Sequence, residues 1–269
     1  MSFKPMKPQD IDVSGVEVTA LKKLDNGANV AYVNYNGKPI YITTPELEVP
    51  FDSQWWPSSE GDSSGKWSMK ANLRGEDCKH LISLFQKMDT FLKENAMKNS
   101  VAWFKKRNLS EDTIDTLYTP MLKEDIDPES GEPTGKYPPS LSFKIVKREG
   151  KVNCKVFGEG KKEFNVQNDS EEEYIKIEDL VKKGSKVKLL LRCNGLWVAN
   201  GKFGCTWRAE QMKVVRAATF DECVFDSDEE EEVQKIDQNF VDTESEEESE
   251  ASEEEVKTTS KKPRKVNKK

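Results

Sequence analysis

The chain has 269 residues, of which 35% are hydrophobic and 34% charged, and its formal net charge is −7. Part of it therefore cannot be packed core, although residues 1–219 are long enough to bury one as a single domain. Five scattered cysteines without a Cys-x-x-Cys pair, and a single histidine, argue against a zinc site and indicate a reducing compartment. The first thirty residues contain no long apolar run, so neither a signal peptide nor a membrane span is expected.

The N-terminal part is predicted to form short strands. β-rich runs at 16–21, 30–35 and 40–44 are separated by Asp25-Asn26-Gly27 and Asn36-Gly37, which favour the positive φ angles of hairpin turns. A simple meander is the expected arrangement. After a loop at 55–65, hydrophobic residues then occupy every second position from Trp67 to Leu73, the pattern of a half-buried strand.

The hydrophobic period changes at residue 76. From 76 to 95 apolar residues recur at three- and four-residue spacing, which places them on one face of a helix. A second short helix at 101–106, and a third that Ser110 caps and that runs to Tyr118, complete a helical insertion of about 76–120. His80 has no catalytic partner beside it in the sequence and is expected to be an ordinary surface residue.

Strands return after the insertion. Segments 141–147 and 152–157 flank Glu149-Gly150, a hairpin signature, and 169–183 resembles a short capped helix or turn that Gly184 closes. Residues 186–193 alternate so that one face is apolar and the other carries Lys186, Lys188 and Arg192. The fold class expected is mainly β (α+β).

The segment from 194 to 208 is the most specific part of the chain. Two Gly-containing turns separate short runs in which Trp197, Phe203 and Trp207 are interleaved with Lys202 and Arg208. Aromatic rings stack on unpaired bases and neighbouring cations contact phosphates, which is how single-stranded nucleic acid is held with little sequence preference. The alternative is that these rings are core, as aromatic residues on strands usually are, but at least one is expected to be exposed.

Trp55 and Trp56 form a second aromatic pair in a polar loop, where they serve either as a lid over the core or as a stacking clamp. No residue is expected to be catalytic or to bind a metal. The residues predicted to bind nucleic acid are Trp197, Lys202, Phe203, Trp207, Arg208, Lys186, Lys188, Arg192, Trp55 and Trp56.

Four segments of this region, GSKVKLLLR (184–192), LWV (196–198), GKFGCTWR (201–208) and QMKV (211–214), resemble a known family. They are similar to the C-terminal part of the OB-fold single-stranded DNA-binding proteins of podophages and their relatives in nucleocytoplasmic large DNA viruses. The resemblance implies a five-stranded barrel, interrupted by a helix, that binds single-stranded DNA in replication and recombination. An aromatic residue closes the tail of the phage proteins, whereas Phe225 and Phe240 are internal here, so polymerase recruitment through a terminal aromatic is not implied.

The end of the chain reverses its charge. Residues 221–256 contain 18 acidic residues against Lys235 alone, 257–269 carry a net +7, and residues 1–220 are left with +3. Segment 220–269 is therefore expected to be a disordered acidic tail with a basic end. Tethered to a basic domain, it is expected to occupy the cationic surface until DNA displaces it, or else to serve solubility only. Its basic end either resembles a nuclear import signal or is simply basic.

The function expected is sequence-independent binding of single-stranded DNA in viral-type DNA replication and recombination, with replication proteins as further partners of the tail. No cofactor, membrane partner or enzymatic activity is expected, since no P-loop, Gly-x-Ser-x-Gly or histidine-rich metal motif is present. The location expected is the host nucleus or a cytoplasmic viral replication site. The alternative is an interaction protein of the histone-chaperone or replication-scaffold class, in which the acidic run binds basic partners.

Overall fold

The structure is a computed structural model that describes residues 5–24, 27–58, 61–167 and 171–216. The described part is mainly β with a helical insertion, which confirms the predicted fold class. The predicted tail at 220–269 and its boundary with the domain lie outside the described residues, as do Asp25 and Asn26 of the first predicted turn.

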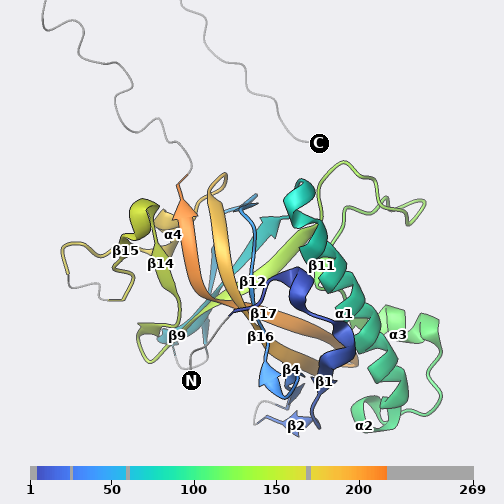
Figure 1. The fold of residues 1–269 in the computed structure, drawn as a ribbon. Helices are drawn as coiled ribbons and strands as arrows, with labels where there is room; N and C mark the ends of the chain where they lie inside the picture. The colour runs from blue at the N-terminus through green and yellow to red at the C-terminus, as the bar shows by residue number, and fades with distance from the viewer. Residues whose placement is uncertain (1–4, 25–26, 59–60, 168–170, 217–269) are drawn as a thin grey trace, which may run out of the picture. The chain divides into compact units, whose positions relative to one another are not determined.

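Five strands form a closed ring in the order β7, β9, β12, β17, β16 and back to β7. Their bounds are β7 (Leu47–Glu48), β9 (Gly61–Asn72), β12 (Ser140–Arg148), β16 (Lys186–Ala199) and β17 (Lys202–Val215). Figure 1 labels β9, β12, β16 and β17 of this ring. Neighbours are antiparallel except β12 and β17, which run parallel. β6 (Tyr41–Thr43) comes just before β7 in the chain and also pairs with β16. A five-stranded barrel of this kind is OB-fold-like.

The remaining strands are short and lie around the barrel. Their bounds are β1 (Val16–Val18), β2 (Lys22–Lys23), β3 (Asn29–Ala31), β4 (Val33–Tyr35), β5 (Lys38–Pro39), β8 (Gln54–Ser58), β10 (Tyr118–Thr119), β11 (Leu122–Lys123), β13 (Lys151–Val152), β14 (Lys155–Phe157) and β15 (Glu163–Phe164). The expected N-terminal meander forms in part. The segments at 16–23 and 29–35 pair antiparallel, through β1 with β4 and β2 with β3, and β4 pairs with β5, but the run at 40–44 pairs with β16 through β6. The run at 30–35 also divides at Tyr32. β3 joins β16 of the barrel, whereas β4 pairs with β1 and β5 in a separate sheet.

The helical insertion lies where the sequence predicts it. The helices are α1 (Lys79–Lys98), α2 (Ser100–Phe104), α3 (Glu111–Leu117) and α4 (Ile177–Leu180), with 3-10 turns η1 (Pro8–Asp10), η2 (Val13–Gly15), η3 (Glu76–Cys78) and η4 (Glu159–Lys161). Ser110 caps α3 as predicted, since its Oγ accepts a hydrogen bond of 3.3 Å from the backbone N–H of Thr113. Among the described residues, no helix is long and apolar enough to cross a membrane.

The apolar face of α1 packs against the barrel, and α2 and α3 lie near its C-terminal end (Figure 1). The ring of Phe85 meets that of Trp207 edge-on at 5.2 Å between centroids. Tyr118, which follows α3, packs on Phe203 at 4.9 Å. The insertion therefore buries aromatic rings of the β16–β17 hairpin. The removal of this apolar surface from water stabilises the fold.

Two of the predicted turns confirm the hairpins expected from them. Asn36 and Gly37 connect β4 to β5, and Glu149 and Gly150 connect β12 to β13, all with positive φ. Asn194-Gly195 is not the turn that the sequence suggests. It lies within β16, at a register shift relative to β17, and is therefore a bulge in a continuous strand.

Candidate nucleic-acid interface

Five side chains follow one another across neighbouring strands on the outside of the barrel, and we call them the outer row. The pairing register places Ser68 of β9 beside Lys144 of β12, Lys144 beside Arg208 of β17, Arg208 beside Arg192 of β16, and Arg192 beside Tyr41 of β6. Each is partly exposed and has buried neighbours before and after it in the strand. The row therefore faces solvent, because alternate residues of a strand point to opposite sides.

Two of the three cations of the outer row, Arg208 and Arg192, share one carboxylate, that of Glu210. Arg208 Nε donates a hydrogen bond of 2.6 Å to Glu210 Oε1, and Arg192 lies 3.8 Å from the same oxygen. No ion pair of Lys144 is found within the described part of the chain. Partial burial, and next the charge of Lys66, lower the pKa of the Lys144 ammonium. With three cations in the row and one paired carboxylate, positive charge is in excess at its centre.

The basic face predicted for 186–193 is solvent-exposed and continues the row along β16. Lys188 lies directly opposite Lys213 of β17, and both are exposed. Like charges directly opposite one another destabilise a strand pair, so this pair favours an anionic ligand. Lys186, at the start of the strand, lies 3.4 Å from Glu46 and is partly neutralised.

The two neighbouring tryptophans of β8 have different environments. Trp55 lies opposite Trp67, packs on its ring at 4.4 Å between centroids, and belongs to the cover of the core. Trp56 lies opposite Lys66 on the outer face and is 48% exposed. Of the pair, Trp56 thus has an accessible ring beside a cation, whereas Trp55 is a lid.

The burial of the other predicted rings removes two of them from the candidate surface. Phe203 is 0% and Trp207 1% exposed, so neither presents a face to a base. Phe203 contacts Tyr118, Trp103 and Phe104 of the helical insertion. The alternation of residues along its own β-strand does not predict that these three rings bury it. Trp197 is half-buried beside Gly204, and Lys202 is exposed at the hairpin turn, away from the outer row. Both remain predictions.

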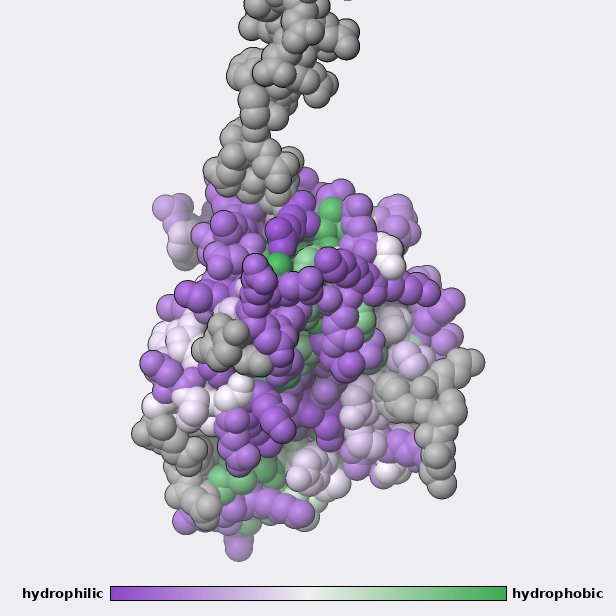
Figure 2. Space-filling model, turned by 90° about the vertical axis from the view of Figure 1, so that its left-hand side faces the viewer, coloured by the Kyte–Doolittle hydropathy of each residue, from purple (hydrophilic) through white to green (hydrophobic). Residues whose placement is uncertain are grey.

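A groove of about 480 Å³ lies beside the outer row. It is lined by Tyr41 and Arg208 of the row together with Asn153, Gln167 and Gln211, among others. The view from the side of β14 and β15 shows mainly hydrophilic residues, with apolar ones in smaller areas among them (Figure 2). The groove combines polar groups, among them Arg208 and Glu210, with apolar surface, and its cations can contact the phosphates of a nucleic acid.

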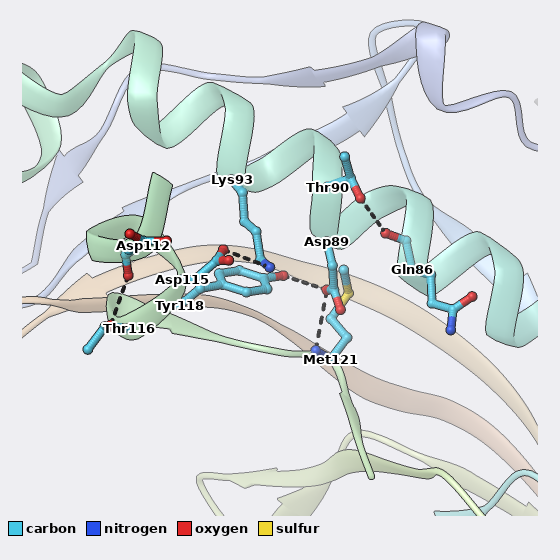
Figure 3. A network of polar contacts seen from close by, with 9 residues as sticks. All are labelled: Gln86, Asp89, Thr90, Lys93, Asp112, Asp115, Thr116, Tyr118 and Met121. Carbon is cyan, nitrogen blue, oxygen red and sulfur yellow. Dashed lines mark hydrogen bonds and ion pairs between the residues drawn. The ribbon is translucent and has the colours of Figure 1, made fainter. Parts of the chain in front are cut away.

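A second polar cluster lies between the helical insertion and the barrel (Figure 3). Tyr118 Oη donates a hydrogen bond of 2.5 Å to Asp89 Oδ1 of α1, and the backbone N–H of Met121 donates another of 3.3 Å to the same oxygen. Burial raises the pKa of Asp89 to about 6, although these two hydrogen bonds and the charge of Lys93 act in the opposite direction. These hydrogen bonds tie α1 to the segment at 118–121, whose strand β10 pairs with β17 of the barrel.

No family model and no curated protein matches the chain. Solved structures similar to it include single-stranded DNA-binding proteins of phages. One is gp2.5 encoded by bacteriophage T7, with 15% identity over 77% of this chain and 100% of that chain and a TM-score of 0.40. Another is the protein of bacteriophage Enc34 in complex with single-stranded DNA, with 11% identity over 76% and 97% and a TM-score of 0.39.

These TM-scores and identities are too low to establish a family or a function for the chain. The resemblance to podophage and large DNA virus proteins stays a prediction. The OB-fold-like ring follows from the strand pairing of this chain by itself.

Sequence reasoning missed parts of the outer face that lie far apart in the chain. Tyr41 was not among the predicted residues, although its neighbours Ile40 and Ile42 are both fully buried and the alternation is visible in the sequence. Lys66 was missed in the same way, one residue before the buried Trp67. The alternation of buried and exposed residues along each strand indicates that Tyr41 and Lys66 are on the outer face. The strand pairing that brings them together joins segments far apart in the sequence.

Proposed function

We propose that this protein binds single-stranded DNA without sequence preference and that the strand runs along the outer row. The observation that carries the proposal is the row itself, in which Lys144, Arg208 and Arg192 lie side by side with one carboxylate between them. Cations so placed repel one another unless a polyanion neutralises them. A chain of phosphates is such a ligand.

Single strands fit this surface better than duplexes for two reasons. The row bends around four neighbouring strands of a small barrel, and a duplex is far too stiff to follow such a curve, its persistence length being about 50 nm. Trp56 also presents an exposed ring beside Lys66. Only unpaired bases have free faces on which such a ring can stack.

The proposal extends to the acidic segment and to the setting in which the protein acts. Residues 221–256, with a net charge of −17, compete with DNA for the basic domain and contact replication proteins. The setting is viral-type DNA replication and recombination, in the host nucleus or at a cytoplasmic replication site. This part rests on charge and on the sequence resemblance alone.

The test is a titration of the full chain with labelled oligo(dT) and with a duplex of equal length, followed by fluorescence anisotropy at several salt concentrations. We expect tighter binding of oligo(dT), with a slope of log K against log salt of about −2 to −3 for three to four neutralised phosphates. Lys144→Met is expected to make the slope shallower by about 0.7, because one phosphate contact is lost.

Lys38→Met is the matched control, since Lys38 is exposed on β5, outside the barrel ring. Equal slopes for both variants would remove the outer row from the interface. Failure to bind oligo(dT), together with binding of histones, would replace the proposal by the histone-chaperone class, in which the acidic run is itself the binding site.

A further inference from the structure

A pocket of about 560 Å³ opens where β7, β9 and β12 meet, at one end of the outer face. Its size lies within the range of small-molecule sites. It is lined by Glu48, Phe51, Lys70, Lys123, Glu124 and Tyr137, with further residues from 125, 138, 140 and 183–184. None of these belongs to the interface predicted from the sequence.

Two exposed aromatic rings border this pocket. Phe51 is 61% exposed and Tyr137 is 59% exposed, whereas large aromatic side chains are mostly buried in folded proteins. The ammonium of Lys70 lies 5.6 Å from the centroid of the Phe51 ring, and that of Lys136 lies 5.3 Å from Tyr137. Each ring is thus accompanied by a cation, the combination that holds an unpaired base and its phosphate.

The walls of the pocket are held in place by hydrogen bonds. The backbone N–H of Lys183 donates to Asp52 Oδ1 at 2.8 Å, and that of Gly184 donates to the carbonyl of Val49 at 2.8 Å. On the opposite side the N–H of Leu73 donates to the carbonyl of Pro139 at 2.8 Å. The segments carrying the two rings are therefore anchored before any ligand arrives, which limits the entropy lost on binding.

The charges that line the pocket balance. Lys70, Lys123 and Lys183 are opposed by Glu48, Glu124 and Asp125. Asp125 already accepts a hydrogen bond of 2.5 Å from Thr134 Oγ1. For Glu48 and Glu124, no side-chain hydrogen bond or ion pair is found among the described residues. A phosphate would be repelled by these two carboxylates, whereas the amino group of a neutral base is a donor that suits them.

The pocket is continuous with the path proposed for the strand. Lys70 points to the same side of β9 as Ser68 of the outer row and lies about 7 Å further along it, at two residues' distance. A phosphate beside Lys144 could therefore be followed by one beside Lys70. The base attached there would then be directed toward Phe51 and Tyr137.

We propose that this pocket binds one unpaired base of the DNA strand and that it adds a modest preference for bases with an exocyclic amino group to the sequence-independent contacts of the outer row. The inference rests on the proposed function. Phe51 or Tyr137 stacks on the base, and Glu48 or Glu124 accepts a hydrogen bond from the N4 amino group of cytosine or the N6 amino group of adenine. Uracil and thymine present a carbonyl oxygen at that position, which a carboxylate repels.

The experiment compares the affinities of the full chain for oligo(dC) and oligo(dU) of equal length at pH 7.5 and constant salt. The two bases have the same ring and differ at the edge that the carboxylates would contact. We expect oligo(dC) to bind about fivefold more tightly, the usual net effect of one hydrogen bond. The double variant Glu48→Ala/Glu124→Ala is expected to bind both oligomers equally, whatever its effect on overall affinity.

Phe51→Leu is expected to weaken binding of both oligomers by about fivefold, the lower end of what one stacked base contributes. The matched controls are Glu17→Ala and Tyr32→Leu, which change an exposed acid and an exposed ring outside the pocket and are expected to leave both affinities unchanged. Thermal unfolding of each variant checks that it is folded. Substitutions at exposed positions are expected to change the stability little.

Equal affinities of the unaltered chain for oligo(dC) and oligo(dU) would overturn the pocket proposal and leave the proposed function standing. A preference that survives in the double variant would also overturn it, since the carboxylates would not be its source. Binding of neither oligomer would overturn the proposed function, and the pocket proposal with it.

Discussion

Asp89 lies where the helical insertion meets the barrel, and burial of its carboxylate lowers the stability of the fold at neutral pH. Burial raises its pKa to about 6, whereas an aspartate in the unfolded chain titrates near 3.9. The native state therefore keeps a proton that the unfolded state has released between these values. Since stability falls with rising pH wherever the native state binds more protons, this group destabilises the fold progressively from about pH 4 to pH 6.

Asp89→Asn should therefore stabilise the protein at neutral pH. The amide oxygen still accepts the hydrogen bonds from Tyr118 and Met121, but the ionisation is gone. Urea unfolding is expected to give a gain of about 3 kcal/mol at pH 7.5, the equivalent of a shift of roughly two pKa units. The gain should disappear below about pH 4, where the native carboxyl is protonated in any case.

Tyr118→Phe provides the matching variant. It keeps the ring that packs on Phe203 but removes the hydroxyl whose hydrogen bond lowers the pKa of Asp89. The pH range over which stability falls should consequently extend to higher pH. A stability difference between Asp89→Asn and the unaltered chain that does not vary with pH would show that Asp89 does not titrate in this range.

At the scale of elements, the bulge in β16 determines how the N-terminal strands meet the barrel. Gly195 has φ 106, and a Cβ placed on it would lie 2.2 Å from the carbonyl oxygen of Ala31 in β3. The absence of a side chain lets the backbone of β3 approach this closely. The bulge thus lets β3, which pairs with β2 on one side as the sequence suggests, also pair with β16 on the other.

Gly195→Ala should accordingly destabilise the protein by about 3 kcal/mol or more, through combined backbone strain and steric overlap. Gly201 is the matched control, because it also has a positive φ of 75 but nothing within 4 Å of an added Cβ. Gly201→Ala should cost about 1 kcal/mol, the strain of the left-handed conformation alone. If both variants lose the same free energy of unfolding in urea, the close approach of β3 to Gly195 does not add to the cost of the substitution.

Local signals in the sequence predict individual elements of this fold well. Paired residues with positive φ at 36–37 and 149–150 mark hairpins, and the change of period at residue 76 marks the insertion. The sequence does not show which element covers which strand. Phe203 and Trp207 alternate with polar residues as a stacking surface would, yet the insertion buries both, because contacts from residues 85 to 118 reach them from far along the chain.

The candidate surface shows the same limit. The basic side of 186–193 follows from strand alternation, and Arg208 and Arg192 were predicted individually. Their position beside Lys144 depends on the parallel pairing of β12 with β17, which joins residues about sixty positions apart. Register of this kind is set by the whole barrel rather than by local propensity.

For the whole molecule, the decisive property is the distribution of charge. Residues 1–220 carry +3 and residues 221–256 carry −17, and the proposed function includes competition of this acidic segment with DNA for the basic domain. Deleting residues 221–269 is expected to tighten oligo(dT) binding on the order of tenfold at low salt, with the gain vanishing as salt screens the competition. Deleting only 257–269 leaves the acidic run in place and is expected to give no such gain. Unchanged affinity after the longer deletion would show that the segment does not compete, while loss of histone binding in that variant would favour the chaperone class.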